Sequence, residues 1–159
     1  VRANVSAGVD PASGLGGASA GGPQPTPARA LAPMSWDAGL AAQAEAYAGQ
    51  CVFAHDGARG DLGENLYVSS DLGALISASQ VMGLWTREAA DYDVTAARCR
   101  SGAMCGHYTQ IVWEETSRVG CGAALCPGGV DGFGRPGQLW VCRYSPVGNY
   151  IGEAPYRPG

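Results

Sequence analysis

The residues best suited to chemistry are the two histidines, His55 and His107, which are the only ones in the chain. Glu64 follows His55 in a polar, glycine-rich stretch, and Glu88 precedes His107. Neutral imidazole is the commonest protein ligand of zinc and copper, and the two carboxylates could complete a metal shell or act as a base. Since no H-E-x-x-H motif is present, such a site would be assembled from separate loops. From spacing alone, four surface residues without a common role are the simpler interpretation.

Two short motifs match enzyme signatures in their letters only. Residues 17–21 read G-A-S-A-G, the pattern of serine hydrolases, but no strand is expected before them and no helix after them. Residues 132–137 read G-F-G-R-P-G, a dinucleotide fingerprint, but Pro136 and the lack of a following helix favour a hairpin loop. We interpret both matches as chance and expect no organic cofactor.

The charge pattern argues against several classes of partner. The chain has 159 residues and a net charge of −4, and its ten basic residues are all arginines, scattered singly. Nucleic acids and anionic membrane surfaces require a concentrated positive field, so neither is an expected primary partner. No apolar run approaches the ~20 residues that span a bilayer. The length fits one domain.

The cysteines predict three disulfides. Their number is even, no C-x-x-C pair suggests a zinc site, and disulfides indicate an oxidising compartment and therefore a secreted protein. Six reduced, buried thiols in a cytosolic protein are the alternative. Composition leaves all fifteen connectivities open. The six residues are Cys51, Cys99, Cys105, Cys121, Cys126 and Cys142.

Two helices with one apolar face each are expected before residue 90. Ser35 or Asp37 would cap the first helix. The second helix would start after Asp71, with Glu88 near its end. The apolar faces comprise Trp36, Leu40, Ala44, Tyr47 and Cys51 in the first helix and Leu72, Leu75, Ala78, Met82 and Trp85 in the second.

The rest of the chain predicts two strands and one low-complexity segment. Residues 119–126 and 138–144 read as strands joined by a Gly- and Pro-rich loop, with two cysteines at roughly facing positions. Segment 107–113 fits either a strand or a short helix. Residues 8–32 hold six Gly, six Ala and four Pro, which offer too little apolar surface to offset the entropy of ordering. We therefore expect an N-terminal segment, residues 1–32, with a mobile arm, followed by a folded domain, residues 33–159.

Four strings that occur in order together resemble a known family: P-M-S-W-D (33–37), G-E-N-L (63–66), C-G-H-Y-T-Q-I-V-W (105–113) and C-R-Y-S-P-V-G-N-Y (142–150). The chain resembles the CAP superfamily of cysteine-rich secretory, antigen 5 and class-one pathogenesis-related proteins, and its plant branch above all. This resemblance covers about residues 33–156. It implies an α+β fold class, a three-layer α-β-α sandwich stapled by three disulfides. The implied pairs are Cys51–Cys126, Cys99–Cys105 and Cys121–Cys142.

The resemblance also implies a cleft lined by two histidines and two acidic residues. Matched by motif, these are His55, Glu64, Glu88 and His107, and the match outweighs the simpler interpretation of their spacing. A divalent cation such as zinc would bind the imidazoles, while the glutamates orient them, bind the ion or hold a water. Because a protonated imidazole cannot bind a metal, we expect binding to weaken in acid.

Capture of a sterol or another lipid is the family activity that the resemblance implies for this chain. The loop of residues 91–106 matches the region implicated in sterol binding, and Tyr92 and Met104 offer apolar contact there. An ordinary surface connection is the alternative reading of this loop. We expect a secreted, monomeric defence-type protein that binds lipid and associates with a membrane or cell-wall surface.

Two other functions stay open. A metal-dependent hydrolase could use the same cleft, but no nucleophile or oxyanion hole is evident, so a binding protein is expected rather than an enzyme. The segment Pro146 to Tyr156 resembles a signalling peptide of plant members, although three further residues follow it here. The chain departs from the family in three segments, which are the long arm at residues 8–32, the lengthened spacer at residues 58–62 and the enlarged hairpin loop at residues 127–137. Trp140, which follows this loop, is also bulkier than the residue that the family usually has there.

Overall fold

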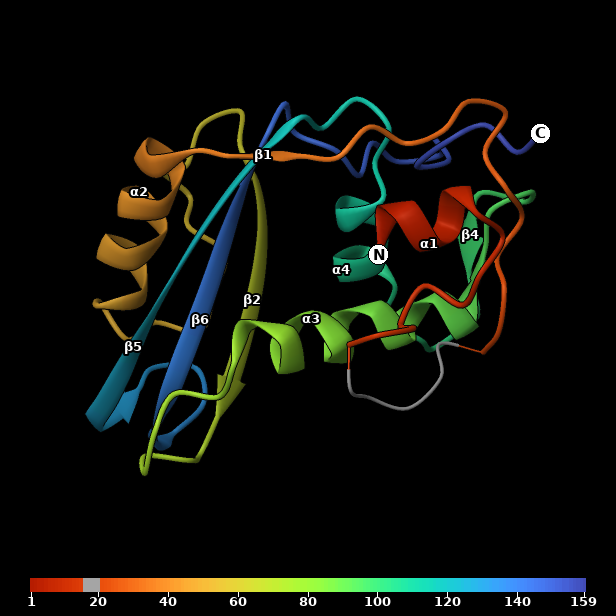
Figure 1. The fold of residues 1–159 in the computed structure, drawn as a ribbon. Coiled ribbons are helices and arrows are strands. Elements are labelled where there is room, and N and C mark those ends of the chain that lie inside the picture. Colours follow the sequence, from red (N-terminus) through yellow and green to blue (C-terminus); the bar gives the residue numbers. More distant parts are fainter. Residues whose placement is uncertain (16–20) are drawn as a thin grey trace. The chain divides into compact units, whose positions relative to one another are not determined.

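A computed structural model describes residues 1–15 and 21–159 of the chain (Figure 1). The chain divides into two compact units, each built from segments that are separated in sequence. We call Met34–Ile76 with Arg118–Val147 the sheet unit, and Val1–Pro33 with Ser77–Ser117 and Gly148–Gly159 the helix unit. Each unit is described by itself. Helices and strands occur together, which confirms the α+β class.

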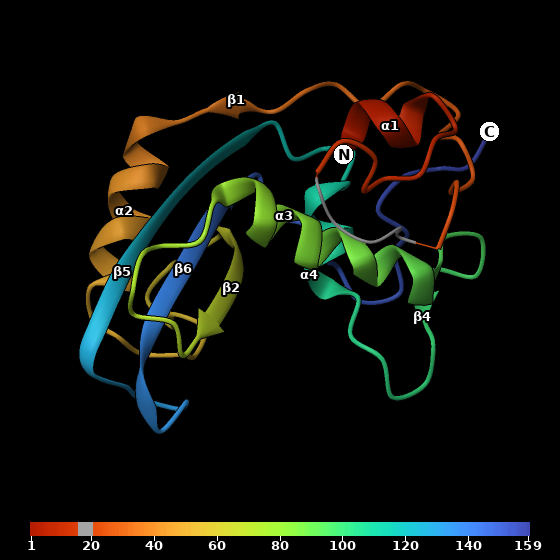
Figure 2. The same ribbon diagram turned by 60° about the horizontal axis from the view of Figure 1, so that its bottom comes forward.

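The sheet unit contains a four-stranded sheet in the order β1-β5-β6-β2 (Figure 2). β1 runs parallel to β5, and the other neighbouring pairs are antiparallel. The predicted strand pair is confirmed and is longer than expected, and Cys121 lies directly opposite Cys142. The elements are β1 (Ser35–Trp36), α2 (Ala38–Ala48), β2 (Gly63–Ser69), β5 (Arg118–Val130) and β6 (Arg135–Ser145).

Helix α2 begins after Asp37, which caps it. The Asp37 side chain accepts a hydrogen bond from the backbone N–H of Leu40, and this bond is the main reason why the pKa of Asp37 lies below its ordinary value. Leu40, Ala44 and Tyr47 are buried as predicted. The prediction was wrong for Trp36, which is 62% exposed because it belongs to strand β1 ahead of the helix.

Two glycines let α2 lie directly on β5. A Cβ atom at Gly120 would come within 2.2 Å of the Ala41 backbone nitrogen, and one at Gly122 within 2.4 Å of Glu45. The helix and strand therefore touch backbone to backbone, which leaves the larger side chains of α2 to pack against the rest of the sheet. The resulting core cluster consists of Ala44, Tyr47, Ala48, Leu66, Cys126, Val130, Leu139 and Val141.

In the helix unit, α4 contacts both α3 and the short 3-10 helix η1. Helix α4 resolves the ambiguity of segment 107–113, because residues 106–111 are helical. A two-stranded hairpin of β3 and β4 follows η1. The elements are α1 (Arg2–Ser6), α3 (Ala78–Thr86), η1 (Arg87–Asp91), β3 (Tyr92–Asp93), β4 (Arg98–Cys99) and α4 (Gly106–Ile111).

Helix α3 begins later than the sequence predicted. Ser77 and Gln80 form a capping box, in which the Ser77 side chain accepts from the Gln80 backbone and the Gln80 side chain accepts from the Ser77 backbone. This local pairing starts the helix at Ala78, so the predicted start after Asp71 was wrong. Leu72 and Leu75 are accordingly exposed instead of lying on a buried face.

The N-terminal segment is partly packed into the helix unit. Ala12 and Leu31 are buried, and the Leu31 backbone N–H donates to the Ser6 hydroxyl. These contacts differ from the expected mobile arm, because two apolar side chains of the arm do find buried positions. Residues 17–20 of the G-x-S-x-G match lie outside the described residues.

All three implied disulfides are present, and they hold all six cysteines. Cys51–Cys126 and Cys121–Cys142 lie in the sheet unit, and Cys99–Cys105 lies in the helix unit. Within residues 1–15 and 21–159, no helix has both the length and the apolar character needed to cross a bilayer.

Candidate functional site

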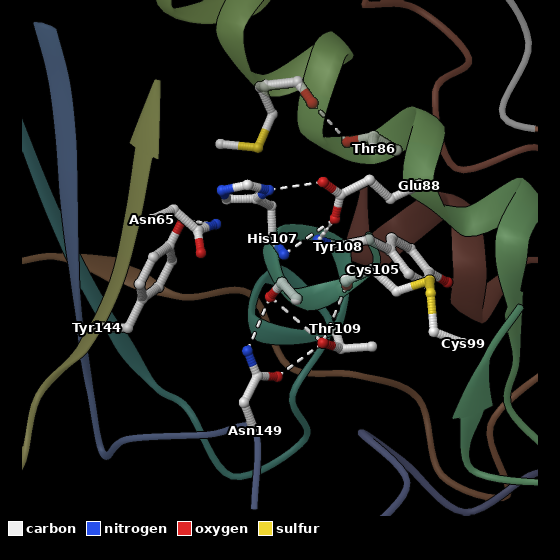
Figure 3. A network of polar contacts seen from close by, with 12 residues as sticks. Asn65, Thr86, Glu88, Cys99, Cys105, His107, Tyr108, Thr109, Tyr144 and Asn149 are labelled. Atoms are coloured by element: carbon white, nitrogen blue, oxygen red, sulfur yellow. Dashed lines mark hydrogen bonds and ion pairs between the residues drawn. A yellow bond between two sulfur atoms is a disulfide. The ribbon is translucent and has the colours of Figure 1, made fainter. Parts of the chain in front are cut away.

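His107 of α4 is held by Glu88 of η1 (Figure 3). The ring nitrogen Nδ1 lies 2.6 Å from Glu88 Oε1, while the backbone N–H groups of His107 and Tyr108 donate to Glu88 Oε2 at 3.0 and 3.1 Å. One carboxylate therefore fixes both the imidazole and the first turn of α4. Both side chains are largely buried, with exposed fractions of 21% for His107 and 15% for Glu88.

Two further contacts restrict His107. Trp85 of α3 stacks on the imidazole with 5.6 Å between ring centroids and 11° between planes. Cys105, directly before α4, is tied to Cys99 of β4. The position of His107 thus depends on three elements of the helix unit. The sequence had indicated Trp85 only as a packing residue.

His55 and Glu64 form the second histidine–glutamate pair, in the sheet unit. His55 Nδ1 lies 2.7 Å from Glu64 Oε1, and the backbone N–H of Asp56 donates to the same oxygen at 3.1 Å. The carboxyl group of Glu64 is completely buried, whereas the His55 side chain is 59% exposed. The loop that the sequence indicated as lengthened still brings the two residues together, helped by hydrogen bonds from Arg59 to the carbonyl groups of Asp56 and Leu62.

Arg143 and Asp56 belong to this second pair but were not singled out from the sequence. Arg143 Nε lies 3.2 Å from Glu64 Oε2, and its Nη2 donates to Asp56 Oδ2 at 2.8 Å. The hydrogen bond from Arg143 is the main cause that lowers the pKa of Asp56. The available signal was an arginine between Cys142 and Tyr144 in a strand with an otherwise apolar buried face.

Each pair has the donor arrangement of a metal-binding histidine. A carboxylate accepts hydrogen bonds, so in the neutral imidazole each contact assigns the proton to Nδ1 and the lone pair to Nε2. Histidines that bind metals commonly donate their other N–H to a carboxylate, which sets the tautomer and the ring orientation. The residues therefore fit a divalent ion bound through Nε2. Among residues 1–15 and 21–159, no three or more His, Cys, Asp or Glu side chains gather as a metal-binding group.

The predicted lipid-binding loop borders a hollow of about 240 Å³ in the helix unit. Tyr92 lines it and meets Tyr108 edge-on, with ring centroids 6.4 Å apart. Burial raises the pKa of Tyr92. Met104 of the same loop is 65% exposed. The wall opposite the loop includes Trp113 and Tyr150, whose rings lie 5.9 Å apart.

Residues 148–156 of the segment compared with a signalling peptide are packed into the helix unit. Tyr156 is 2% exposed, and its hydroxyl donates to the Pro25 carbonyl at 3.0 Å. The backbone N–H of Gly148 donates to Gln110, and the Pro155 carbonyl accepts from Glu114. These contacts are those of a C-terminal tail that packs against the fold, which is the alternative to a signalling peptide.

Comparison with known proteins gives a family match over most of the chain. The model of the cysteine-rich secretory protein family, CAP, matches residues 8–144. Peptidase inhibitor 16 of Homo sapiens is 45% identical over 128 residues, which are 79% of this chain and 27% of that protein. Pathogenesis-related leaf protein 4 of Solanum lycopersicum is 42% identical over 132 residues, which are 79% of this chain and 73% of that protein. The chain thus spans about a quarter of the peptidase inhibitor relative.

A solved structure with the same fold adds to this match. The crystal structure of NaASP2 with Zn²⁺ superimposes with a TM-score of 0.74 and 29% sequence identity. The superposition covers 99% of this chain and 80% of NaASP2. The fold is therefore matched along almost the whole chain.

Proposed function

Because the chain belongs to the CAP family of cysteine-rich secretory proteins, we propose that it is a secreted protein in which His55 of the sheet unit and His107 of the helix unit each serve as a ligand of a divalent metal ion. One observation carries this proposal: each histidine has its Nδ1 within 2.7 Å of a largely buried glutamate. The two pairs come from different elements and have different surroundings, yet they orient the imidazole in the same way. If the histidines served only in packing, the same contact between Nδ1 and a glutamate would not be required in both pairs.

The chemistry of the donors favours zinc among the divalent ions. Imidazole nitrogen suits zinc and copper, whereas magnesium and calcium prefer oxygen ligands. NaASP2, which shares the fold, has been crystallised with Zn²⁺. A bound zinc ion would act as a Lewis acid toward water or a ligand oxygen. The contribution of the chain is to orient each imidazole by a hydrogen bond from Nδ1 to its glutamate, so that Nε2 of the neutral ring carries the lone pair.

Calorimetric titration with zinc at neutral pH tests the proposal. We expect binding by the parent protein, weaker binding by His55→Ala and by His107→Ala, and loss of binding in the double variant His55→Ala/His107→Ala. Glu64→Gln and Glu88→Gln should weaken the affinity by about 10–100-fold, the usual effect of losing an orienting partner. Glu115→Gln changes an exposed carboxylate outside both pairs and serves as the matched control. Zinc binding that survives the double variant His55→Ala/His107→Ala would show that the histidines are not ligands.

A second candidate function, lipid capture, is favoured by the hollow beside residues 91–106. Tyr92 lines that hollow, and the exposed Met104 provides apolar surface on the same loop. The volume of about 240 Å³ is below the ~300–1,000 Å³ of pockets that enclose a drug-sized ligand. A sterol would consequently insert one end and rest the remainder against the exposed loop.

Retention of radiolabelled cholesterol or ergosterol tests lipid capture. Met104→Ser removes apolar surface without disturbing a buried side chain, so we expect weaker retention by a folded protein. Leu125→Ser is the matched control, because Leu125 is an exposed apolar residue on β5, in the sheet unit. Equal retention by the parent and Met104→Ser would assign the sterol to another surface.

A further inference from the structure

The buried ends of two strands hold an arginine against the glutamate of the exposed histidine. Glu64 of β2 and Arg143 of β6 are direct cross-strand partners. Their side chains are 0% and 2% exposed. The Arg143 guanidinium also lies over the ring of Tyr47 from α2, 5.3 Å from its centroid. The arginine is therefore enclosed by the helix and the sheet instead of projecting into solvent.

Asp56 contacts a different nitrogen of the same guanidinium. Its Oδ2 accepts from Arg143 Nη2 at 2.8 Å, while its backbone N–H donates to Glu64 Oε1 at 3.1 Å. Asp56 directly follows His55 in the chain. A closed circuit of contacts thus joins His55, Glu64, Arg143 and Asp56, and it begins and ends at neighbouring residues of one loop.

The two glutamates are held by different means. Glu88 accepts two backbone N–H groups at the start of α4, which any side chains at those positions would supply. Glu64 accepts one backbone N–H and faces the guanidinium of Arg143. The orientation of the sheet-unit carboxylate therefore depends on the identity of one side chain.

We infer that Arg143 is a positioning residue for the metal site: it holds Glu64 in the orientation that keeps the proton of His55 on Nδ1 and the lone pair on Nε2. This inference rests on the proposed function, since it concerns the atom through which His55 would bind an ion. Arg143 itself touches no ligand. It acts through Glu64, and the hydrogen bond from Nη2 to Asp56 fixes the guanidinium.

The planar guanidinium suits this task better than an ammonium group. The arginine side chain ends in a rigid plane, so one guanidinium can hydrogen-bond Asp56 and form an ion pair with Glu64 at a fixed angle. A lysine keeps the charge but offers a single flexible point of contact. Arg143→Lys is therefore the informative variant, because it separates charge from geometry.

The test reads the imidazole tautomer directly, in protein free of metal. Long-range ¹H–¹⁵N NMR spectra at one fixed, neutral pH distinguish a ring with its proton on Nδ1 from one with its proton on Nε2. Because the chain has only two histidines, His107 serves as an internal reference. We expect Arg143→Lys and Asp56→Asn to move the His55 signals toward a mixture of tautomers and leave those of His107 unchanged. A His55 spectrum identical to the parent in both variants would overturn the inference.

Two controls keep this result separate from folding and from metal binding. Arg118→Lys alters another arginine of the same sheet, which pairs with Asp37 at 2.9 Å and touches neither histidine, so the spectra should match the parent. Asp56 is partly exposed, which makes Asp56→Asn the variant that retains the fold if Arg143→Lys does not. Zinc titrations on the same proteins should show about 10–100-fold weaker binding. A parent that fails to bind zinc, with tautomers that still shift, would refute the proposed function and leave the positioning role intact.

Discussion

At the scale of single residues, Tyr144 shows how burial commits a side chain to one protonation state. It lies on β6 with no exposed surface, and the Asn65 side chain donates to its hydroxyl at 3.1 Å. Burial raises the pKa of Tyr144 well above its ordinary value, with the bond from Asn65 acting in the opposite direction. The hydroxyl is therefore neutral in the folded protein, and it ionises only when the chain unfolds.

Tyr144→Phe should change the alkaline stability of the protein. A pKa raised by folding contributes stability below the unfolded value of about 10, and this contribution is lost as the pH rises further. We expect the variant to lose about 1 kcal/mol at neutral pH, because the hydrogen bond is gone. The deficit should shrink above about pH 10, because ionisation of Tyr144 then stabilises the unfolded state of the parent, whereas the phenylalanine of the variant has no group to ionise. Urea unfolding of both proteins from neutral pH to above about pH 10 measures this difference in stability. A difference that stays constant over the whole range would contradict the prediction.

The residues of the candidate site were predictable from the sequence to different degrees. Glu64 and His107 could be placed because they stand in recognisable strings, whereas His55 and Glu88 followed only from the family resemblance that those strings carry. The structure joins the four residues in two pairs. Their metal-binding role stays a prediction. Arg143 could not be assigned, since its contact with Glu64 depends on the β2–β6 register, which the sequence does not state.

At the scale of elements, the close approach of α2 and β5 depends on two positions without side chains. The Cβ contacts at Gly120 and Gly122 would both involve the backbone of α2 rather than a flexible side-chain end. The helix would have to move outward to admit either methyl group, and the core cluster beneath it would open. This dependence was invisible in the sequence, where both glycines simply interrupt a strand.

Gly120→Ala should destabilise the protein by about 1–3 kcal/mol or more, the range for overpacked interiors. The Ala41 nitrogen 2.2 Å from the added methyl group cannot rotate away. Gly128→Ala provides the comparison, because nothing lies within 4 Å of that position, and its effect should stay within about 0.5 kcal/mol. Urea denaturation with circular dichroism gives both values, and equal effects would show that α2 is not packed this tightly.

Element boundaries were harder to predict than the elements themselves. The cap at Asp37 and the strand pair of β5 and β6 followed from local signals that the structure retains. The start of α3 did not, because leucines at helical spacing before residue 77 suggested helix although the capping box lies further on. A local pairing of two polar side chains outweighed an apolar pattern.

At the scale of the whole molecule, the disulfides differ mainly in how much chain they close. Cys51–Cys126 spans 75 residues, and Cys99–Cys105 spans 6. A cross-link restricts the unfolded chain more strongly when its loop is longer. The first bridge also joins the end of α2 to β5, so it ties the two sides of the sheet-unit core together.

Removing these bridges one at a time should give unequal losses. The loop-entropy relation gives about 4.5 kcal/mol for the longer loop and about 2 kcal/mol for the shorter one. We therefore expect Cys51→Ala/Cys126→Ala to unfold at a clearly lower urea concentration than Cys99→Ala/Cys105→Ala. Native-state mass spectrometry should confirm that the remaining bridges are intact. A larger loss from the short loop would mean that local contacts around Cys105 dominate.

The interleaving of the two units in the sequence has a consequence for biosynthesis. The chain passes from one unit to the other four times, and residues 148–159 are part of the helix unit. A ribosome that has released the chain only as far as residue 117 has therefore supplied neither unit in full. No single cut in the gene separates one complete unit from the other, because segments of the two units alternate along the chain. Dissection of this protein requires circularly permuted or co-expressed fragments.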